Sequence, residues 1–222
     1  MTGTLALVGG GEFRDGCSFD AGLLEASGAS EVLVLPTGAA YEQPGELVER
    51  AVSWFDRLGV PARGLDVLGR PDALDAANAA AVASSAFTYL VGGSPMHLRS
   101  VLKDSPVWDG IVAAWHGGGT LAGSSAGAMV LCDPMVDPRG GAFTVGLGLL
   151  TSLTVVPHHD NWSDDASHRT RKMTPSGLVL AAVDERTALI RDDGGRWRAE
   201  GAGAVVLFRD GRPAMLDDLV GA

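Results

Sequence analysis

The hydrophobic positions of this chain form short apolar runs that alternate with longer stretches in which apolar and polar residues recur at helical spacing. A glycine or proline break follows each short run, and this pattern predicts strands. The predicted strands of the first half are Thr4–Val8, Glu31–Pro36, Ala62–Val67, Ala86–Val91 and Thr120–Gly123. The predicted helices are Ala21–Ala26, Glu46–Leu58, Ala73–Ser84, Met96–Leu102 and Val107–Trp115. This alternation predicts an α/β fold, a mostly parallel sheet with helices on both faces.

The pattern changes after the middle of the chain. Leu153–Val156 is a further buried-strand candidate, and short strands are predicted at Ala188–Arg191, Arg196–Glu200 and Ala204–Phe208. The turn sequence Asp192-Asp193-Gly194-Gly195 joins the first two of these short strands. We therefore expect a short antiparallel C-terminal extension at one edge of the sheet. The whole chain, residues 1–222, falls within the size of a single domain.

Composition and charge exclude several classes of partner. The chain has 17 Lys and Arg against 27 Asp and Glu, a formal net charge of −10. Because this charge repels phosphate backbones and anionic membrane surfaces, we expect neither nucleic acid nor a membrane as partner. No window reaches the roughly 18 consecutive apolar residues that a membrane span needs. Two cysteines and no basic leader before the first strand favour a cytoplasmic protein with reduced thiols.

A serine lies where the fifth predicted strand turns into a helix. The sequence there is Gly123-Ser124-Ser125-Ala126-Gly127-Ala128, with the predicted helix at Ala126–Cys132. Glycines two residues before and after Ser125 allow a strained turn, and such a turn lifts a nucleophile out of a sheet. The motif G-x-S-x-G alone is weak, and a packing turn without chemistry is the alternative. Its position between strand and helix favours Ser125 as a nucleophile.

A serine hydroxyl needs a base, and five histidines are available. His158 follows the predicted strand Leu153–Val156, so it lies at the same sheet edge as the serine turn and is the favoured base. His159 is the second choice. His97 falls in a predicted helix and His116 at the C-terminus of another, where a structural role is favoured, and His168 either lines a pocket or is solvated.

The developing oxyanion of an acyl-transfer reaction needs hydrogen-bond donors. The backbone N–H of Ala126 starts the helix after the serine. The N–H of Gly93 lies in the loop after Ala86–Val91, at the same edge of the sheet, where ligands of open α/β sheets bind. A tight turn at Gly92-Gly93 without a catalytic role is the alternative.

These motifs, in this order, resemble the dipeptidase E and cyanophycinase family of serine peptidases. The residues that carry the resemblance are Gly9-Gly10-Gly11-Glu12, Leu90-Val91-Gly92-Gly93, Gly123–Ala128, Gly146-Leu147-Gly148-Leu149 and Pro157-His158, and they span nearly the whole chain. The resemblance implies a class I glutamine-amidotransferase-like fold in which serine replaces the usual cysteine nucleophile. It also implies Ser125 as nucleophile, His158 as general base, and Gly93 with Ala126 as oxyanion donors.

The same resemblance implies a triad acid between nucleophile and histidine. Asp137 is favoured because it has more freedom to reach the imidazole than Asp133, which could cap a local turn. A backbone carbonyl that orients His158 is the third option.

Substrate preference follows only in part from the resemblance. Relatives of the dipeptidase E type cleave after an N-terminal aspartate, and relatives of the cyanophycinase type act on a peptide of aspartate with arginine on its side chains. Arg169 and Arg171 could supply a cation for aspartate, whereas Glu12 would suit a basic group, and His159 is a further substrate-binding candidate. A more general interpretation is that such charges are solvated. No metal and no organic cofactor is implied, and a homodimer is one candidate oligomeric state.

Two other functions compete with a peptidase. An α/β-hydrolase esterase also uses G-x-S-x-G, but only 33 residues separate Ser125 from His158, too few for the further strands and helices that this fold places before its histidine. An amidotransferase-like domain that binds a small ligand without turnover is the second alternative, because fold does not decide function. We expect a serine peptidase of small peptides, with aspartyl or isoaspartyl bonds among its candidate substrates.

Overall fold

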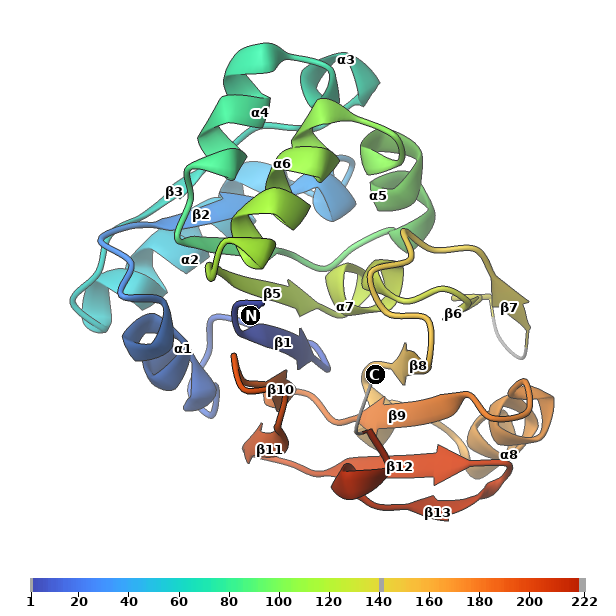
Figure 1. Cartoon of the computed structure of the whole chain (residues 1–222). Helices are drawn as coiled ribbons and strands as arrows, with labels where there is room; N and C mark the ends of the chain where they lie inside the picture. Colours follow the sequence, from blue (N-terminus) through green and yellow to red (C-terminus); the bar gives the residue numbers. More distant parts are fainter. Residues whose placement is uncertain (1, 140–141, 220–222) are drawn as a thin grey trace.

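The centre of the protein is a twisted sheet of mostly parallel strands. The computed structural model describes residues 2–139 and 142–219. Among these residues the strands are ordered β11 (Trp197–Gly201), β10 (Thr187–Arg191), β1 (Leu5–Val8), β5 (Thr120–Ser124), β4 (Phe87–Leu90), β2 (Val32–Leu35) and β3 (Ala62–Gly64). The strands β1, β5, β4, β2 and β3 are parallel to one another. β10 pairs antiparallel with β1, and β11 pairs antiparallel with β10 (Figure 1). The predicted parallel sheet with an antiparallel extension is confirmed.

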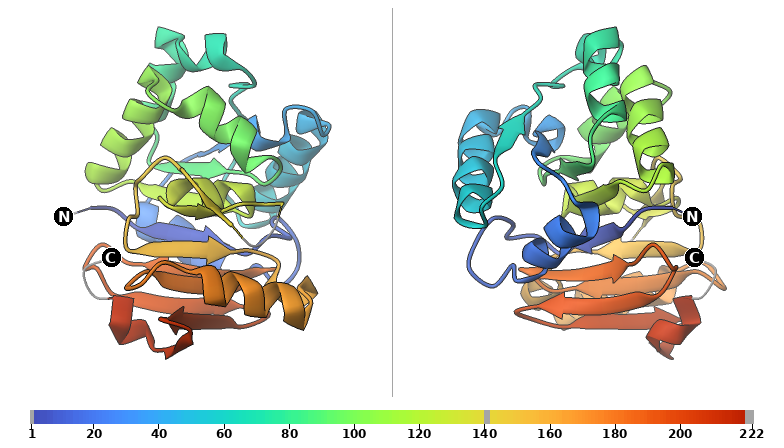
Figure 2. Two further views of the ribbon diagram at one scale, coloured as in Figure 1. Left: turned by 90° about the vertical axis from the view of Figure 1, so that its right-hand side faces the viewer. Right: turned by 60° about the vertical axis from the view of Figure 1, so that its left-hand side comes forward.

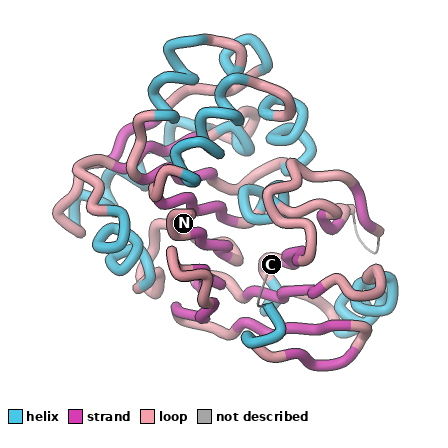
Figure 3. Tube along the Cα trace, in the orientation of Figure 1, coloured by secondary structure: helices cyan, strands magenta, loops and turns pink. Residues whose placement is uncertain are grey.

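Helices cover both faces of this sheet, because successive side chains of each strand point to opposite sides. Leu5 and Leu7 of β1 join one apolar cluster, and Ala6 and Val8 join the other. The first cluster packs against α4 (Ala76–Ala83), α5 (Pro95–Leu102), α6 (Pro106–His116) and α7 (Ala126–Leu131), and the second against α1 (Phe19–Ser27) and α2 (Pro44–Arg57). Figure 3 shows the strands running between these two helical layers. Burial on both faces explains why the sequences of β1 and β2 are continuously apolar.

One predicted helix is divided in two. The sequence pattern predicts a helix over Ala73–Ser84, but the structure has α3 (Arg70–Ala73) and then α4. Asp75 separates them, since its side chain accepts hydrogen bonds from the backbone N–H groups of Ala77 and Asn78 and caps the start of α4.

A second sheet lies beside the β10–β11 extension, at the end of the molecule away from α3 and α4 (Figure 2). Its order is β13 (Arg212–Ala214), β12 (Val205–Arg209), β9 (Val179–Val183) and β8 (Leu153–Val156), with β8 parallel to β9. The predicted strand Ala204–Phe208 therefore pairs with β9 in this sheet. Neither β9 nor α8 (Asp164–Met173) is predicted from the sequence.

Short elements complete the chain. A hairpin of β6 (Met135–Val136) and β7 (Phe143–Thr144) follows α7, and single 3-10 turns are η1 (Thr37–Ala39), η2 (His159–Asn161) and η3 (Leu216–Leu219). No helix in the described residues combines the length and apolar character needed to cross a bilayer.

Candidate active site

Ser125 lies at a sharp turn between β5 and α7. Its backbone has φ 49° and ψ −110°, an uncommon conformation for a residue other than glycine. The flanking glycines are needed for close approach: a Cβ at Gly123 would lie 2.5 Å from the carbonyl oxygen of Gly127, and one at Gly127 would lie 2.3 Å from that of Leu90. The strain of the turn is therefore carried by Ser125 itself, and the glycines allow the helix to pack against the sheet.

His158 meets the serine from the other sheet. It follows β8 in a left-handed conformation with φ 51°, and its Nε2 lies 2.8 Å from the Oγ of Ser125. The loop after β1 passes directly against the imidazole, because a Cβ at Gly10 would lie 2.2 Å from its Cε1. The structure thus brings together the predicted nucleophile and the predicted base.

The second imidazole nitrogen contacts Glu185. Nδ1 of His158 lies 2.8 Å from Oε1 of Glu185, in the loop between β9 and β10. The backbone N–H of Glu185 donates to Oδ1 of Asp160 at 3.0 Å, which fixes this loop near η2. About a third of each of the two paired side chains is exposed, 37% for His158 and 34% for Glu185. A hydrogen-bonded chain therefore runs from Ser125 through His158 to Glu185.

Three consecutive carbonyl groups, beginning at the last residue of β1, hold the three segments that carry Ser125, His158 and Glu185. Each accepts a hydrogen bond from the backbone N–H of a residue with positive φ. The pairs, acceptor first, are Val8 with Ser125 at 2.9 Å, Gly9 with His158 at 2.7 Å and Gly10 with Arg186 at 2.7 Å. Segments that are distant in sequence are thereby aligned along one stretch of backbone.

The expectation that Asp137 orients the histidine does not match this geometry. Asp137 lies between β6 and β7, where Oδ1 and Oδ2 accept hydrogen bonds from the Arg139 guanidinium at 2.9 and 2.6 Å. These bonds lower the pKa of Asp137 to about 2. Asp133 is also engaged elsewhere, since its Oδ1 accepts from the N–H of Gly146 at 3.3 Å. The carboxylate that contacts His158 follows it in the sequence.

The sequence does contain a signal for Glu185. The apolar run Val179–Val183 precedes Asp184-Glu185-Arg186, and a second apolar run begins at Thr187. Two such runs around a short polar segment predict two strands joined by a tight acidic turn. The resemblance instead implies an acid between Ser125 and His158, a segment that does not contain Glu185.

The two expected oxyanion donors lie on elements beside Ser125. A Cβ at Gly92 would lie 3.4 Å from Cβ of Ser125, so the loop after β4 passes next to the serine. Gly93 has φ +121°, and a Cβ there would lie 2.2 Å from the carbonyl oxygen of Gly38, so only glycine fits. Ala126 is the first residue of α7, where a backbone N–H has no partner within the helix.

The four substrate-binding candidates occupy different environments. Glu12 is buried at 7% exposure, between Gly92 and Ser124. His159 lies 3.5 Å from Oδ1 of Asp184. Arg169 is exposed on α8.

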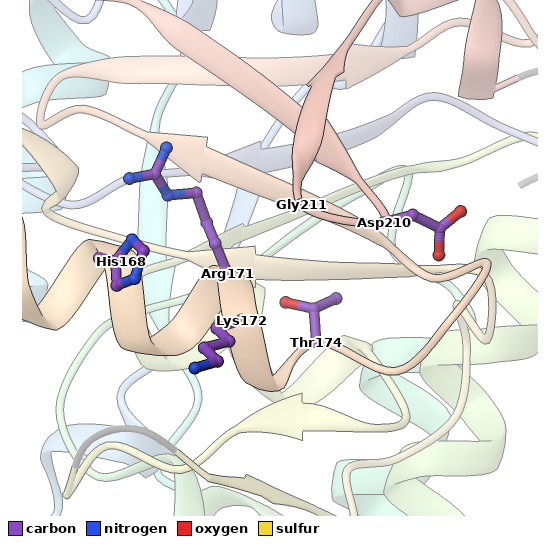
Figure 4. Close-up of a pocket in the computed structure, with 6 residues that line it drawn as sticks. All are labelled: His168, Arg171, Lys172, Thr174, Asp210 and Gly211. Atoms are coloured by element: carbon purple, nitrogen blue, oxygen red, sulfur yellow. The ribbon is translucent and has the colours of Figure 1, made fainter.

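Arg171 also lies on α8, and its side chain contacts the second sheet at Phe208 of β12. Its guanidinium stacks over the Phe208 ring at 4.8 Å, and its Nε donates to the carbonyl oxygen of Ser167. It lines a cavity of about 370 Å³ together with His168, Lys172, Thr174, Asp210 and Gly211 (Figure 4). None of these lining residues takes part in the hydrogen bonds that link Ser125, His158 and Glu185.

A buried polar cluster lies under the site, on the face covered by α1 and α2. Burial raises the pKa of Asp20 to about 8, although Trp54 Nε1 donates to its Oδ2 at 2.9 Å. Burial likewise raises the pKa of Cys17 to about 11. The charge of Glu12 acts in the same direction on both groups. Among the described residues, no group of three or more His, Cys, Asp or Glu side chains could hold a metal ion.

The fold and the site together define an α/β protein in which a serine at a sharp strand-to-helix turn contacts a histidine, and this histidine contacts a carboxylate. Residues 5–196 match the model of peptidase family S51, and the chain belongs to this family. The family and the sheet order do not fit the α/β-hydrolase alternative.

Similar proteins agree with this assignment. The cyanophycinases of Trichormus variabilis and of Nostoc sp. are each 26% identical over 192 residues, which covers 82% of this chain and 64% of theirs. The chain thus spans less than two thirds of their length. The crystal structure of a peptidase from an acI-B1 Actinobacterium has 32% identity and a TM-score of 0.86, covering 96% of this chain and 93% of its own. A putative peptidase E of Listeria monocytogenes shares the fold, with a TM-score of 0.66 and 17% identity over 94% of this chain and 99% of its own.

Proposed function

We propose that this protein is a serine peptidase of short peptides, with Ser125 as nucleophile, His158 as general base and Glu185 as the carboxylate that orients the histidine. The observation that carries the proposal is the continuous hydrogen-bonded chain, 2.8 Å from Oγ to Nε2 and 2.8 Å from Nδ1 to Oε1. Hydrolysis by an activated serine requires three groups: a nucleophile, a base in contact with it, and a third group that orients the base. Membership of peptidase family S51 supports the same reaction class.

The first half of the reaction forms an acyl-enzyme. Oγ of Ser125 attacks the peptide carbonyl carbon while its proton passes to Nε2 of His158. Glu185 holds the proton on Nδ1, which fixes the tautomer that can accept at Nε2 and stabilises the imidazolium that forms. The negative charge on the former carbonyl oxygen is stabilised by the backbone N–H groups of Gly93 and Ala126.

The second half releases both products. The imidazolium of His158 gives its proton to the leaving amine as the C–N bond breaks. A water molecule then loses a proton to Nε2 and attacks the acyl carbon, and the Ser125 oxygen leaves and recovers a proton from His158. Every proton step uses the same nitrogen, so the position of His158 decides the rate of both halves.

The proposed substrates are short peptides with aspartyl or isoaspartyl bonds. The matching curated relatives are named cyanophycinase, and the motifs of this chain resemble those of the dipeptidase E type. Arg169 and Arg171 do not support a contact with substrate aspartate, because Arg169 is solvated and Arg171 is stacked on Phe208. The bond that is cleaved is therefore proposed from the family rather than from a cation near Ser125.

Labelling with a fluorophosphonate probe tests the nucleophile and its base. We expect one equivalent of probe on Ser125, located by peptide mass spectrometry. Ser125→Ala abolishes this labelling, and His158→Ala slows it strongly because the hydroxyl loses its base. No labelling of the folded wild-type protein would reject the peptidase and favour a domain that only binds a ligand.

A matched pair of variants separates the two carboxylates. Glu185→Gln should slow labelling, whereas Asp137→Asn should leave its rate unchanged because Asp137 contacts Arg139 instead of the histidine. The reverse order would reject Glu185 as the orienting acid. Hydrolysis of Asp-X, β-aspartyl and other N-terminal dipeptides by the purified protein, with Ser125→Ala as control, then identifies the substrate.

A further inference from the structure

A buried carboxylate joins the two segments on either side of the nucleophile. Glu12 lies at the end of the glycine loop after β1. Its Oε1 accepts a hydrogen bond from the N–H of Gly92 at 3.1 Å, and its Oε2 accepts one from the hydroxyl of Ser124 at 2.7 Å. These partners are 80 and 112 residues away in the sequence. One side chain therefore ties the loop after β4 to the last residue of β5.

Both partners of Glu12 are immediate neighbours of groups that act in the proposed reaction. Ser124 directly precedes the nucleophile. Gly92 directly precedes Gly93, the proposed oxyanion donor, and a Cβ at Gly92 would lie 3.4 Å from Cβ of Ser125. The hydrogen bond to the N–H of Gly92 fixes the peptide plane between Val91 and Gly92, so only the φ and ψ of Gly92 separate this fixed plane from the peptide that carries the N–H of Gly93.

We propose that Glu12 is a positioning residue that sets the oxyanion donor of Gly93 against Ser125. This role rests on the proposed function. It replaces the expectation that Glu12 binds a basic group of the substrate, because both of its oxygens are engaged and the residue is buried. An oxyanion donor must meet the oxygen within a few tenths of an ångström, so a brace between donor loop and nucleophile acts on the transition state.

The chemistry of the side chain suits this role. A carboxylate offers several acceptor positions on two oxygens, and hydrogen bonds to an ionised acceptor are shorter and stronger than neutral ones. An apolar side chain at this position would leave the N–H of Gly92 and the hydroxyl of Ser124 buried without an acceptor. The loop would then lose its fixed distance from the nucleophile.

Three variants separate geometry from charge. Glu12→Gln keeps both contacts, because its carbonyl oxygen accepts from Gly92 and its amide donates to the Ser124 oxygen. Glu12→Leu removes both contacts. Ser124→Ala removes one contact and changes only a single oxygen atom. Asp20→Asn is the matched control, since Asp20 is another buried acidic residue, and its side chain accepts a hydrogen bond from the indole N–H of Trp54.

The experiment measures fluorophosphonate labelling of Ser125 over a range of probe concentrations, which gives kinact and KI separately. For Glu12→Leu we expect kinact to fall by about 10- to 100-fold, less than the loss of a whole oxyanion donor. For Ser124→Ala we expect a smaller decrease in kinact, and Glu12→Gln should retain most of the wild-type kinact. KI stays unchanged in each case, because the first encounter with the probe needs no oxyanion contact. Asp20→Asn labels like wild type.

Circular dichroism and thermal unfolding establish which variants are folded before labelling. Failure of the wild-type protein to label concerns the peptidase proposal, and the Glu12 variants are compared only with a wild-type protein that labels. Unchanged kinact in folded Glu12→Leu would overturn the positioning role. Equal losses in Glu12→Gln and Glu12→Leu would also overturn it, since charge would then matter rather than the two contacts. If Glu12→Leu does not fold, unchanged kinact in Ser124→Ala overturns it.

Discussion

Replacement of Asp20 by asparagine should make the protein more stable at neutral pH. Asp20 is completely buried, and one of its oxygens, Oδ1, has no hydrogen-bond partner within the described residues. Burial is the main cause that raises its pKa from 3.8 to about 8, against the opposing effect of the Trp54 hydrogen bond. Asparagine removes the titrating group and keeps an acceptor for the Trp54 indole N–H.

The pKa difference fixes the sign and size of the effect. Between about pH 4 and pH 8 the folded protein keeps the proton of Asp20, whereas the unfolded chain releases it. The folded state therefore binds more protons, and the free energy of unfolding decreases as pH rises through this window. The slope is about 1.4 kcal/mol per pH unit, which accumulates to about 4 kcal/mol at pH 7. Asp20→Asn should lack this contribution.

Urea unfolding followed by tryptophan fluorescence between pH 4 and pH 8 measures the effect. The difference in free energy of unfolding between Asp20→Asn and wild type should grow with pH, and m should stay constant. Asp15→Asn is the matched control, because the Asp15 side chain is 95% exposed and its substitution should give no such trend. A stability difference for Asp20→Asn that does not change with pH would refute the argument.

Further predictions concern the glycine loop and the two cysteines. Gly10→Ala should reduce Ser125 labelling by more than about 100-fold, because the added methyl group would lie 2.2 Å from the His158 imidazole; Gly22→Ala, whose Cβ would meet no heavy atom within 4 Å, should label normally. Burial raises the pKa of Cys17 to about 11 and that of Cys132 to about 12, so neither thiol should react with an aromatic disulfide reagent at pH 8 until urea unfolds the protein. Equal labelling of both alanine variants, or fast reaction of a native thiol, would contradict these expectations.

The central sheet could be predicted because each strand has a local cause. β1, β2, β4 and β5 are buried on both faces, so β1 and β2 are apolar throughout and β4 and β5 are mostly apolar, and the pattern is visible in a few neighbouring residues. The division into two sheets has no such local signal. The sequence Ala204–Phe208 reads as a strand in either arrangement, and only pairing with β9 decides which sheet it joins.

Only part of the site could be predicted from neighbouring residues in the sequence. Ser125 is marked by its glycines and His158 by the end of a buried strand, and both signals are local. Glu185 is placed by the pairing of β9 with β8 and of β10 with β1, which brings the loop between them to His158. The resemblance implies an acid between Ser125 and His158, and the greater freedom of its loop favours Asp137 over Asp133, but Arg139, two residues away, occupies the Asp137 carboxylate.

Backbone conformation and backbone hydrogen bonds position the site more than side-chain contacts do. Ser125, His158 and Arg186 all have positive φ, a conformation that costs of order 1–3 kcal/mol for a residue other than glycine and persists only where the surroundings impose it. Here the imposing element is the stretch from the last residue of β1 to Gly10, whose successive carbonyl groups accept all three N–H groups. Gly9 and Gly10 must remain glycine for this contact. A Cβ at Gly9 would lie 2.2 Å from the carbonyl oxygen of Asp184, and a Cβ at Gly10 would lie 2.2 Å from the imidazole of His158. The opening glycine motif is therefore explained as the surface on which the three site loops are aligned, and a substrate role is not needed to account for it.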